Sequence, residues 1–179
     1  FYLVPFIRGS KVLRHTSGPV LRADWLAEAG LEPPKTIAEW ETVLTAFKEQ
    51  QGCEAPFTGS LTHLRRVFTH AFDIGLDFYP DNKVVKYGPA EDGYKEFLTT
   101  LADWYAKGLI DRNFSTVDRT IQDANMTTGK AGSTYAAGGG QMGPYIKTGQ
   151  AEDPNYDLVS TTFPTKNPGE KPKYMNSFE

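Results

Sequence analysis

The chain has 179 residues, of which 39% are hydrophobic and 13% aromatic, so it is long and apolar enough for one packed domain and is not a disordered chain. Its 19 basic and 22 acidic residues leave a formal net charge of −3, which gives no electrostatic footprint for nucleic acid. The single cysteine, Cys53, excludes an internal disulfide, and no apolar run approaches the roughly 18 residues of a membrane-spanning helix.

In chain order, the first predicted elements are strands over residues 2–7 and 19–21, followed by a short helix over residues 22–29. The two strands are apolar or β-branched runs bounded by turn residues. Gly30 is expected to end the helix, because glycine adopts the left-handed C-terminal conformation without strain.

A longer helix follows, and its start is predicted by a capping box in which Thr36 and Glu39 bond free N–H groups of the first turn. Its apolar face at helical spacing contains Ile37, Trp40, Val43, Leu44 and Phe47. Residues 54–58 then predict a strand, and Ser60 is expected to cap the next helix. That helix is predicted to bury Leu64, Val67, Phe68 and Ala71.

A small hairpin is predicted over residues 78–87, with Pro80-Asp81-Asn82 at its turn. Pro89 opens the helix that follows, and Lys107-Gly108 ends it. The core stripe predicted for this helix consists of Tyr94, Phe97, Leu98, Leu101 and Tyr105.

The last predicted elements are a helix from Thr116 or Asp118 to Thr128 and strands over residues 131–135 and 157–163. Strands that alternate with helices predict an α/β domain. Residues 165–179 are rich in Pro, Lys and Asn and are expected to be a loop or an outgoing connection.

Gly138, Gly140 and Gly143 form the pattern G-x-G-x-x-G, which can cradle a dinucleotide pyrophosphate at the start of a helix. Pro144, however, follows the third glycine at a point where that helix should already be running, and about six residues remain before Gly149. No Lys-Ser or Lys-Thr pair follows the glycines. The sequence therefore favours a flexible strand-to-helix loop and leaves a nucleotide-dependent enzyme as an alternative.

Motifs for catalysis or metal binding are not found. His63 and His70 are seven residues apart on a predicted helix, about 10 Å, which one zinc ion with Zn–N bonds of about 2.1 Å cannot bridge. There is no Cys-x-x-Cys, His-Glu-x-x-His or Gly-x-Ser-x-Gly pattern. We expect no enzyme activity, no metal and no cofactor.

Aromatic residues are plentiful, with nine Tyr, 11 Phe and three Trp. Most of them fit the apolar faces of predicted helices, and Trp25 and Trp104 are also expected to be packing residues. Sugars are commonly held by aromatic faces surrounded by hydrogen-bonding groups. The aromatic residues at strand ends and in loops are therefore candidates for sugar contacts.

Three segments resemble the extracellular solute-binding proteins of bacterial ABC importers, of the sugar-binding type (family 1). The segment LRADWLAEAGLEPPKTIAEWETVLTAFKE, residues 21–49, has the family's Arg, Asp-Trp-Leu, Gly-Leu and Pro-Thr pattern. The segment YKEFLTTLADWYAKGLIDRNFST, residues 94–116, is similar to its Tyr-x-x-Gly-Leu-Ile-Asp region, and residues 129–132 resemble its helix-to-strand step. All three occur in the family's order and at similar spacing.

The resemblance implies a lobe of the type II periplasmic-binding-protein kind, with a short mixed sheet flanked by helices. Residues 1–179 would be one such lobe, the second of two, excised from a longer protein that binds its ligand between the lobes. It also implies a carbohydrate ligand, a membrane permease as partner, a monomer without nucleic acid, and an extracellular location as a cell-surface lipoprotein or periplasmic protein. A surface scaffold domain without a small ligand is the remaining alternative.

Binding residues in α/β folds collect at strand ends and in loops. The expected ligand-binding residues are Arg8, Thr58, Ser60, Ser133, Thr134 and Tyr135. The glycine run after Tyr135 is expected to be a loop at the cleft edge, where backbone N–H groups contact ligand hydroxyls.

Overall fold

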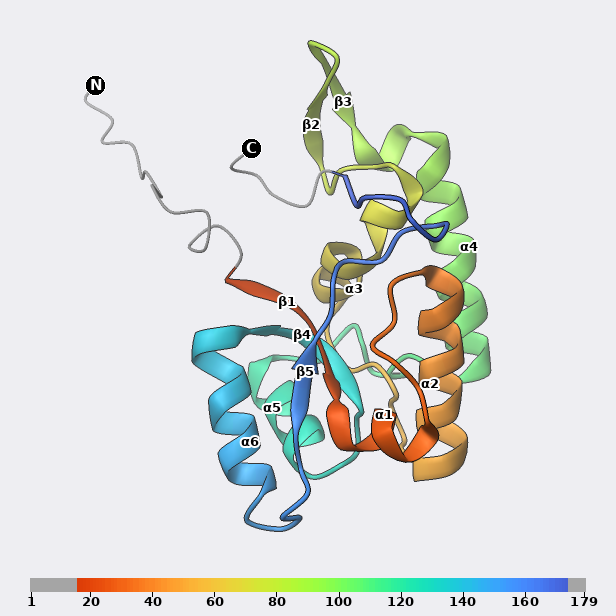
Figure 1. The fold of residues 1–179 in the computed structure, drawn as a ribbon. Coiled ribbons are helices and arrows are strands. Elements are labelled where there is room, and N and C mark those ends of the chain that lie inside the picture. Colours follow the sequence, from red (N-terminus) through yellow and green to blue (C-terminus); the bar gives the residue numbers. More distant parts are fainter. Residues whose placement is uncertain (1–15, 174–179) are drawn as a thin grey trace, which may run out of the picture.

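The computed structural model describes residues 16–173, and its centre is a three-stranded antiparallel sheet in the order β4-β1-β5 (Figure 1). The strands are β1 (Ser17–Arg22), β4 (Ser133–Ala137) and β5 (Leu158–Ser160). Each overlaps a predicted strand, whereas the strand predicted over residues 2–7 lies outside the described residues. β1 is therefore the central strand of the sheet.

Phe57 extends the sheet beyond β4 through isolated parallel bridges to Ser133 and Ile110. Next to it, the Thr58 N–H donates to the Ser133 carbonyl oxygen at 3.0 Å. These parallel contacts beside the antiparallel ladders make the sheet mixed, which agrees with the predicted fold class. The strand predicted over residues 54–58 is reduced to the bridges at Phe57, because its other residues form no ladder.

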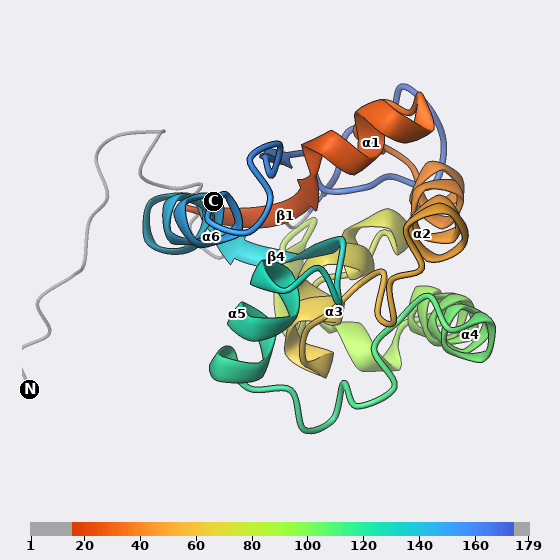
Figure 2. The same ribbon diagram turned by 90° about the horizontal axis from the view of Figure 1, so that it is seen from below.

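The helices flank this sheet, with α5 and α6 on one side and α2 and α4 on the other (Figures 1 and 2). Their bounds are α1 (Ala23–Ala29), α2 (Ile37–Gln51), α3 (Leu61–Phe68), α4 (Asp92–Lys107), α5 (Arg119–Thr127) and α6 (Gly143–Gly149). Shorter 3₁₀ turns occupy Thr69–Phe72 and Gly88–Ala90, and a π-type turn occupies Gly138–Met142. The sequence predicted α1 to α5 but not α6.

The predicted capping box of α2 and the predicted glycine ends of α1 and α4 are confirmed, whereas the helix predicted to open at Pro89 begins at Asp92, after a 3₁₀ turn that contains Pro89. The Glu39 N–H donates to the Thr36 hydroxyl at 3.2 Å, and the Thr36 N–H donates to the Glu39 carboxylate at 3.1 Å, which completes the capping box of α2. Gly30 and Gly108 end α1 and α4 with left-handed φ values of 66° and 70°.

The main core lies between the sheet and helices α2, α3 and α4. Its largest rings meet edge to face, with centroids 5.3 Å apart for Trp40 and Phe68 and 5.1 Å apart for Phe68 and Trp104. The stripe predicted for α4 is wrong in part, because Trp104 is fully buried whereas Leu98 is 46% and Tyr105 37% exposed. The buried face follows the i, i+4, i+7 positions from residue 97, and these two residues each lie one position further round the helix.

The predicted hairpin is present as β2 (Phe78–Asp81) and β3 (Val84–Tyr87), which project from the body of the molecule (Figure 1). The turn predicted at Pro80-Asp81-Asn82 is wrong in part, because Pro80 and Asp81 pair with Val85 and Val84 inside the hairpin ladder. Asn82 and Lys83 form its turn with φ values of 49° and 67°, the left-handed pair that suits a two-residue hairpin loop. None of the helices within residues 16–173 combines the length and the apolar character needed to cross a membrane.

Candidate functional site

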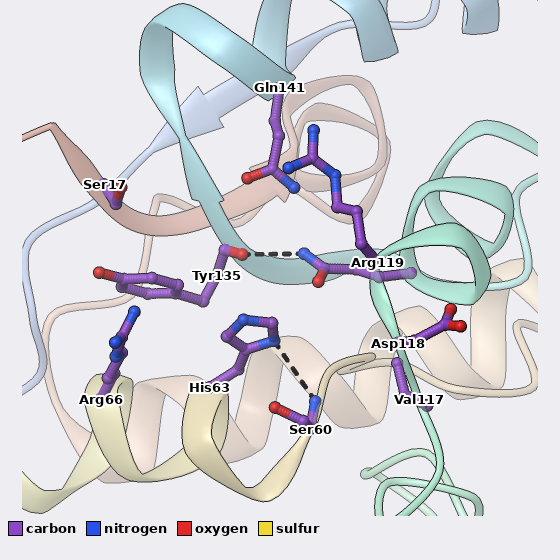
Figure 3. Close-up of a pocket in the computed structure, with 10 residues that line it drawn as sticks. Ser17, Ser60, His63, Arg66, Val117, Asp118, Arg119, Tyr135 and Gln141 are labelled. Carbon is purple, nitrogen blue, oxygen red and sulfur yellow. Dashed lines mark hydrogen bonds between the residues drawn. The ribbon is translucent and has the colours of Figure 1, made fainter.

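An open pocket of about 430 Å³ lies where α3, α5 and the ends of β1 and β4 meet (Figure 3). The side chains that line it are mostly polar. They are Ser17, Ser60, His63, Arg66, Val117, Asp118, Arg119, Gln122, Tyr135 and Gln141. The lining combines one aromatic ring with hydrogen-bonding groups from several elements, so it can offer a ligand both a flat apolar face and donors and acceptors.

The first turn of α3 fixes the tautomer of His63, the histidine that lines the pocket. The Ser60 N–H donates to His63 Nδ1 at 3.4 Å, so the ring proton is placed on Nε2. Burial, together with the positive charge of Arg66, lowers the pKa of His63 below its usual 6.5. At neutral pH His63 is therefore a neutral imidazole with one N–H donor available.

The ring of Tyr135 is the aromatic surface of the pocket. Its centroid lies 5.6 Å from that of His63, with the planes 25° apart, and 5.7 Å from Arg66 Cζ. His63 and Arg66 stand one turn apart on α3, so both side chains reach the ring from that helix (Figure 3). A stacked imidazole and a guanidinium thus hold the ring from below in that view.

Hydrogen bonds hold the backbone beneath this ring in place. Gln122 Nε2 donates to the Tyr135 carbonyl oxygen at 2.9 Å and to Thr134 Oγ1 at 2.8 Å. Thr134 Oγ1 in turn donates to the Thr58 carbonyl oxygen at 2.8 Å. The end of β4 is therefore bonded both to α5 and to the segment before α3.

Three of the predicted ligand-binding residues lie beneath the pocket instead of in it. Thr58, Ser133 and Thr134 are fully buried. The Thr58 hydroxyl donates to Asp111 Oδ2 at 2.9 Å and accepts from Asn125 Nδ2 at 3.0 Å. The Ser133 hydroxyl donates to a backbone carbonyl oxygen at 2.8 Å. Their hydroxyl groups are used within the protein, where they support the segments beneath the pocket, and their role in ligand binding stays a prediction.

The structure places Ser60 and Tyr135 in the lining of the pocket, and Arg8 lies outside the described residues. Their role in ligand binding stays a prediction. Sequence reasoning missed His63 and Arg66. Ser60, His63 and Arg66 follow one another at intervals of three residues, which puts the two side chains on the polar face of α3. The spacing alone does not show that this face lies against β4.

The charged side chains of the pocket differ in their partners. Arg119 Nε donates to both carboxylate oxygens of Asp123 at 2.8 Å, and Asp118 Oδ1 accepts from the Ile121 N–H at 2.9 Å as the cap of α5. Arg66 forms no ion pair with any carboxylate within residues 16–173. It is the pocket cation whose charge is not neutralised by a carboxylate in that range.

The glycine run continues directly into a helix, so the loop expected there is not present. α6 begins at Gly143 with Pro144 in its first turn, where the missing proline N–H is not needed, and the argument that Pro144 prevents a helix is wrong. Gly138, Gly140 and Gly143 all have φ outside the left-handed range, and an added Cβ would meet nothing closer than 4.0 Å. The motif's glycines are therefore not required by the backbone or by close packing.

The described residues contain no group of three or more His, Cys, Asp or Glu side chains that could hold a metal ion. The polar side chains around Tyr135 can donate and accept hydrogen bonds.

Comparison with known proteins gives one sequence relative and several similar folds. No protein-family model matches the chain. Lipoprotein LipO of Bacillus subtilis (strain 168) is 24% identical over 173 residues, which cover 88% of this chain and 34% of that protein.

Among solved structures, the alginate-binding protein AlgQ2 is 28% identical with a TM-score of 0.71, over 86% of this chain and 33% of its own. An HMO-binding, ABC-transporter-associated solute-binding protein from Bifidobacterium longum infantis is 22% identical, with a TM-score of 0.69 over 89% of this chain and 36% of its own. A sugar transporter protein of Bacillus licheniformis in complex with stachyose is 20% identical, with a TM-score of 0.61 over 88% and 42% of the two chains.

The chain is therefore similar to the sugar-binding solute-binding proteins of ABC transporters and has an α/β fold of their kind. This confirms the resemblance and the fold class predicted from the sequence. The chain spans about a third of the length of LipO, AlgQ2 and the HMO-binding protein.

Proposed function

We propose that this chain forms part of a solute-binding protein that captures a saccharide for a bacterial ABC importer, and that the pocket around Tyr135 contacts the sugar. The observation that carries the proposal is the Tyr135 ring, which His63 and Arg66 hold in place in an open, polar pocket. The similar proteins support it, since their names describe alginate-binding, HMO-binding and stachyose-bound proteins.

The chemistry of the pocket suits a sugar, which has an apolar face of C–H groups and a rim of hydroxyls. Tyr135 offers a ring for that face, and the neutral imidazole of His63 offers an Nε2–H to a hydroxyl oxygen. Ser17 and Ser60 carry hydroxyl groups that can donate or accept. These groups bind and orient, and none of them forms a nucleophile–base pair.

In the whole protein, a saccharide would lie between this lobe and a second one. Closure of the two lobes around it would supply most of the affinity. A membrane permease would receive the sugar from a monomeric binding protein outside the cytoplasm, either anchored as a lipoprotein or periplasmic. The chain alone, about a third of the length of its relatives, is then expected to bind weakly.

The test is an NMR titration of the ¹⁵N-labelled 179-residue chain, a method that detects millimolar binding. The panel contains neutral and acidic mono- and oligosaccharides together with ATP and NAD. We expect saturable shifts of the amide signals of His63, Arg66 and Tyr135 with at least one saccharide. Shifts at the glycine run with ATP or NAD, and none with any saccharide, would instead favour the nucleotide enzyme.

A matched pair of variants locates the site. Tyr135→Leu removes the aromatic ring from the pocket, and Tyr105→Leu removes a partly exposed ring that packs against Phe114 outside it. We expect Tyr135→Leu alone to abolish the sugar-dependent shifts. Binding that survives this change, or that either change weakens equally, would place the sugar elsewhere on the chain.

A further inference from the structure

We propose that the pocket selects acidic saccharides, and that the guanidinium of Arg66 binds the carboxylate of a uronic acid residue. This inference rests on the proposed function and names the substrate class of the same site. Its basis is the positive charge of Arg66, which no carboxylate within residues 16–173 neutralises through an ion pair.

Arg66 differs from the two neighbouring arginines, because each of those bonds a carboxylate. Arg65, the adjacent residue on α3, donates to Asp77 Oδ1 at 2.8 Å, and Arg119 across the pocket is held by Asp123. Arg66 is exposed on the last turn of α3 and forms no ion pair with a carboxylate in the part of the chain that the structure describes. Its contact is with the ring of Tyr135, at 5.7 Å.

The other titratable groups near the pocket do not supply a counter-ion for Arg66. His63 is neutral, because burial and the nearby Arg66 charge lower its pKa. Asp118 caps α5 and lies on the far side of the pocket from Arg66 (Figure 3). The Asp123 carboxylate accepts hydrogen bonds from Arg119 and from the Tyr145 hydroxyl. The positive charge beside the Tyr135 ring therefore comes from Arg66.

A uronic acid fits this pair of groups in one pose. Its ring would stack on Tyr135, and its carboxylate would extend from the ring edge toward the guanidinium that lies against the same aromatic side chain. A planar guanidinium binds a carboxylate through two parallel N–H···O bonds, which are stronger than bonds between neutral groups. A neutral hexose would leave this cation without its partner.

The test compares uronic acid oligosaccharides with their methyl esters, which keep the same rings and linkages but remove the charge. Titrations of the 179-residue chain monitored by NMR give both dissociation constants. We expect the acids to bind about tenfold more tightly than the esters, the size of one charge-assisted interaction. Added salt should weaken binding of the acids more than that of the esters.

The chain offers a control for the arginine. Arg112 is also exposed, lies 5.8 Å from the ring of Tyr105 and forms no ion pair within residues 16–173, but it is not in the pocket. We expect Arg66→Gln to abolish the preference for acids and Arg112→Gln to keep it. Unchanged thermal unfolding of Arg66→Gln would show that the variant is folded.

The outcomes separate this inference from the proposed function. Equal binding of acids and esters, or a preference that survives Arg66→Gln, would overturn the role of Arg66 and leave sugar binding intact. A chain that binds neither acids, esters nor neutral saccharides would overturn both proposals.

Discussion

The imidazole of His63 stacks on the phenol ring of Tyr135, with the two ring centroids 5.6 Å apart. The same imidazole accepts the Ser60 N–H through Nδ1, so one side chain both caps α3 and fixes the aromatic surface of the pocket. These two contacts use different parts of the ring and can be separated by substitution.

His63→Gln keeps a side-chain acceptor for the Ser60 N–H, as in a Ser-x-x-Gln capping box, but removes the stacked ring. We expect it to leave the free energy of unfolding within about 0.5 kcal/mol of the wild type and to weaken saccharide binding several-fold. His63→Phe keeps the ring but loses the cap, so it should lower stability by about 1 kcal/mol. Urea unfolding and sugar titration of both variants check this, and equal losses of stability would contradict the separation.

The buried Asp111 carboxylate is expected to be a strong contributor to stability. It accepts from the Thr58 hydroxyl, from Asn125 Nδ2 and from the Asn113 N–H at 2.9, 3.2 and 2.9 Å. Asp111→Ala would leave these donors without their charged acceptor, and we expect a loss of about 3 kcal/mol in urea unfolding. Asp103→Ala is the control, since it removes an exposed ion pair to Lys107 and should cost less than about 0.5 kcal/mol.

Two glycine substitutions should have opposite effects. An added Cβ at Gly132 would lie 2.3 Å from a ring atom of Phe47 and 2.8 Å from one of Trp25, so Gly132→Ala should cost about 2 kcal/mol by overpacking. At Gly139 nothing lies within 4 Å and φ is not left-handed, so Gly139→Ala should stabilise the helical turn by about 0.5 kcal/mol. Thermal unfolding measures both, and destabilisation by Gly139→Ala would indicate that the glycine run needs its flexibility.

Stability should fall in mildly acidic solution because of His70. This side chain is buried against Phe163, and its Nδ1 has no hydrogen-bond partner in the described part of the chain. Burial lowers the pKa of His70 from 6.5 to about 4. The unfolded chain therefore binds the proton more readily, so the contribution of neutral His70 is complete above about pH 6.5 and is lost as the pH falls toward 4.

The loss attributable to His70 is about 3 kcal/mol over that interval. Urea unfolding at a series of pH values, with His70→Gln for comparison, isolates it from the other titrating groups. We expect the variant to depend less steeply on pH between 6.5 and 4, whatever its stability at neutral pH. Parallel pH profiles would show that another group is responsible.

The local elements of the fold were predictable because their signals are local. The Thr36–Glu39 capping box, the left-handed Gly30 and the Asn82-containing turn each act over a few residues. The rotation of α4 was not predictable in this way. Apolar residues occur on more than one side of it, and packing against α2 and α3 selected the face with Trp104.

The site was less predictable, for a reason visible in Thr58 and Tyr135. Both are the last residues of predicted strands, and both carry a hydroxyl group that could contact a ligand. Contacts between distant segments decide the difference, since Asp111 and Asn125 bind the Thr58 hydroxyl inside the protein. His63 and Arg66 enter the site only because α3 packs beneath β4, which no spacing within α3 encodes.

The central position of β1 has a consequence for how the chain folds. Its residues Ser17 to Arg22 pair with residues 133–137 on one side and 158–160 on the other. Contacts between residues so far apart in the sequence form late, and they make folding slower. During synthesis, on the order of 10 s would pass between the emergence of β1 and that of β5. Until residues 133–137 emerge β1 would lack both neighbours, and from then until residues 158–160 emerge it would still lack β5. A chaperone that shields the strand during this time would raise the yield of folded protein.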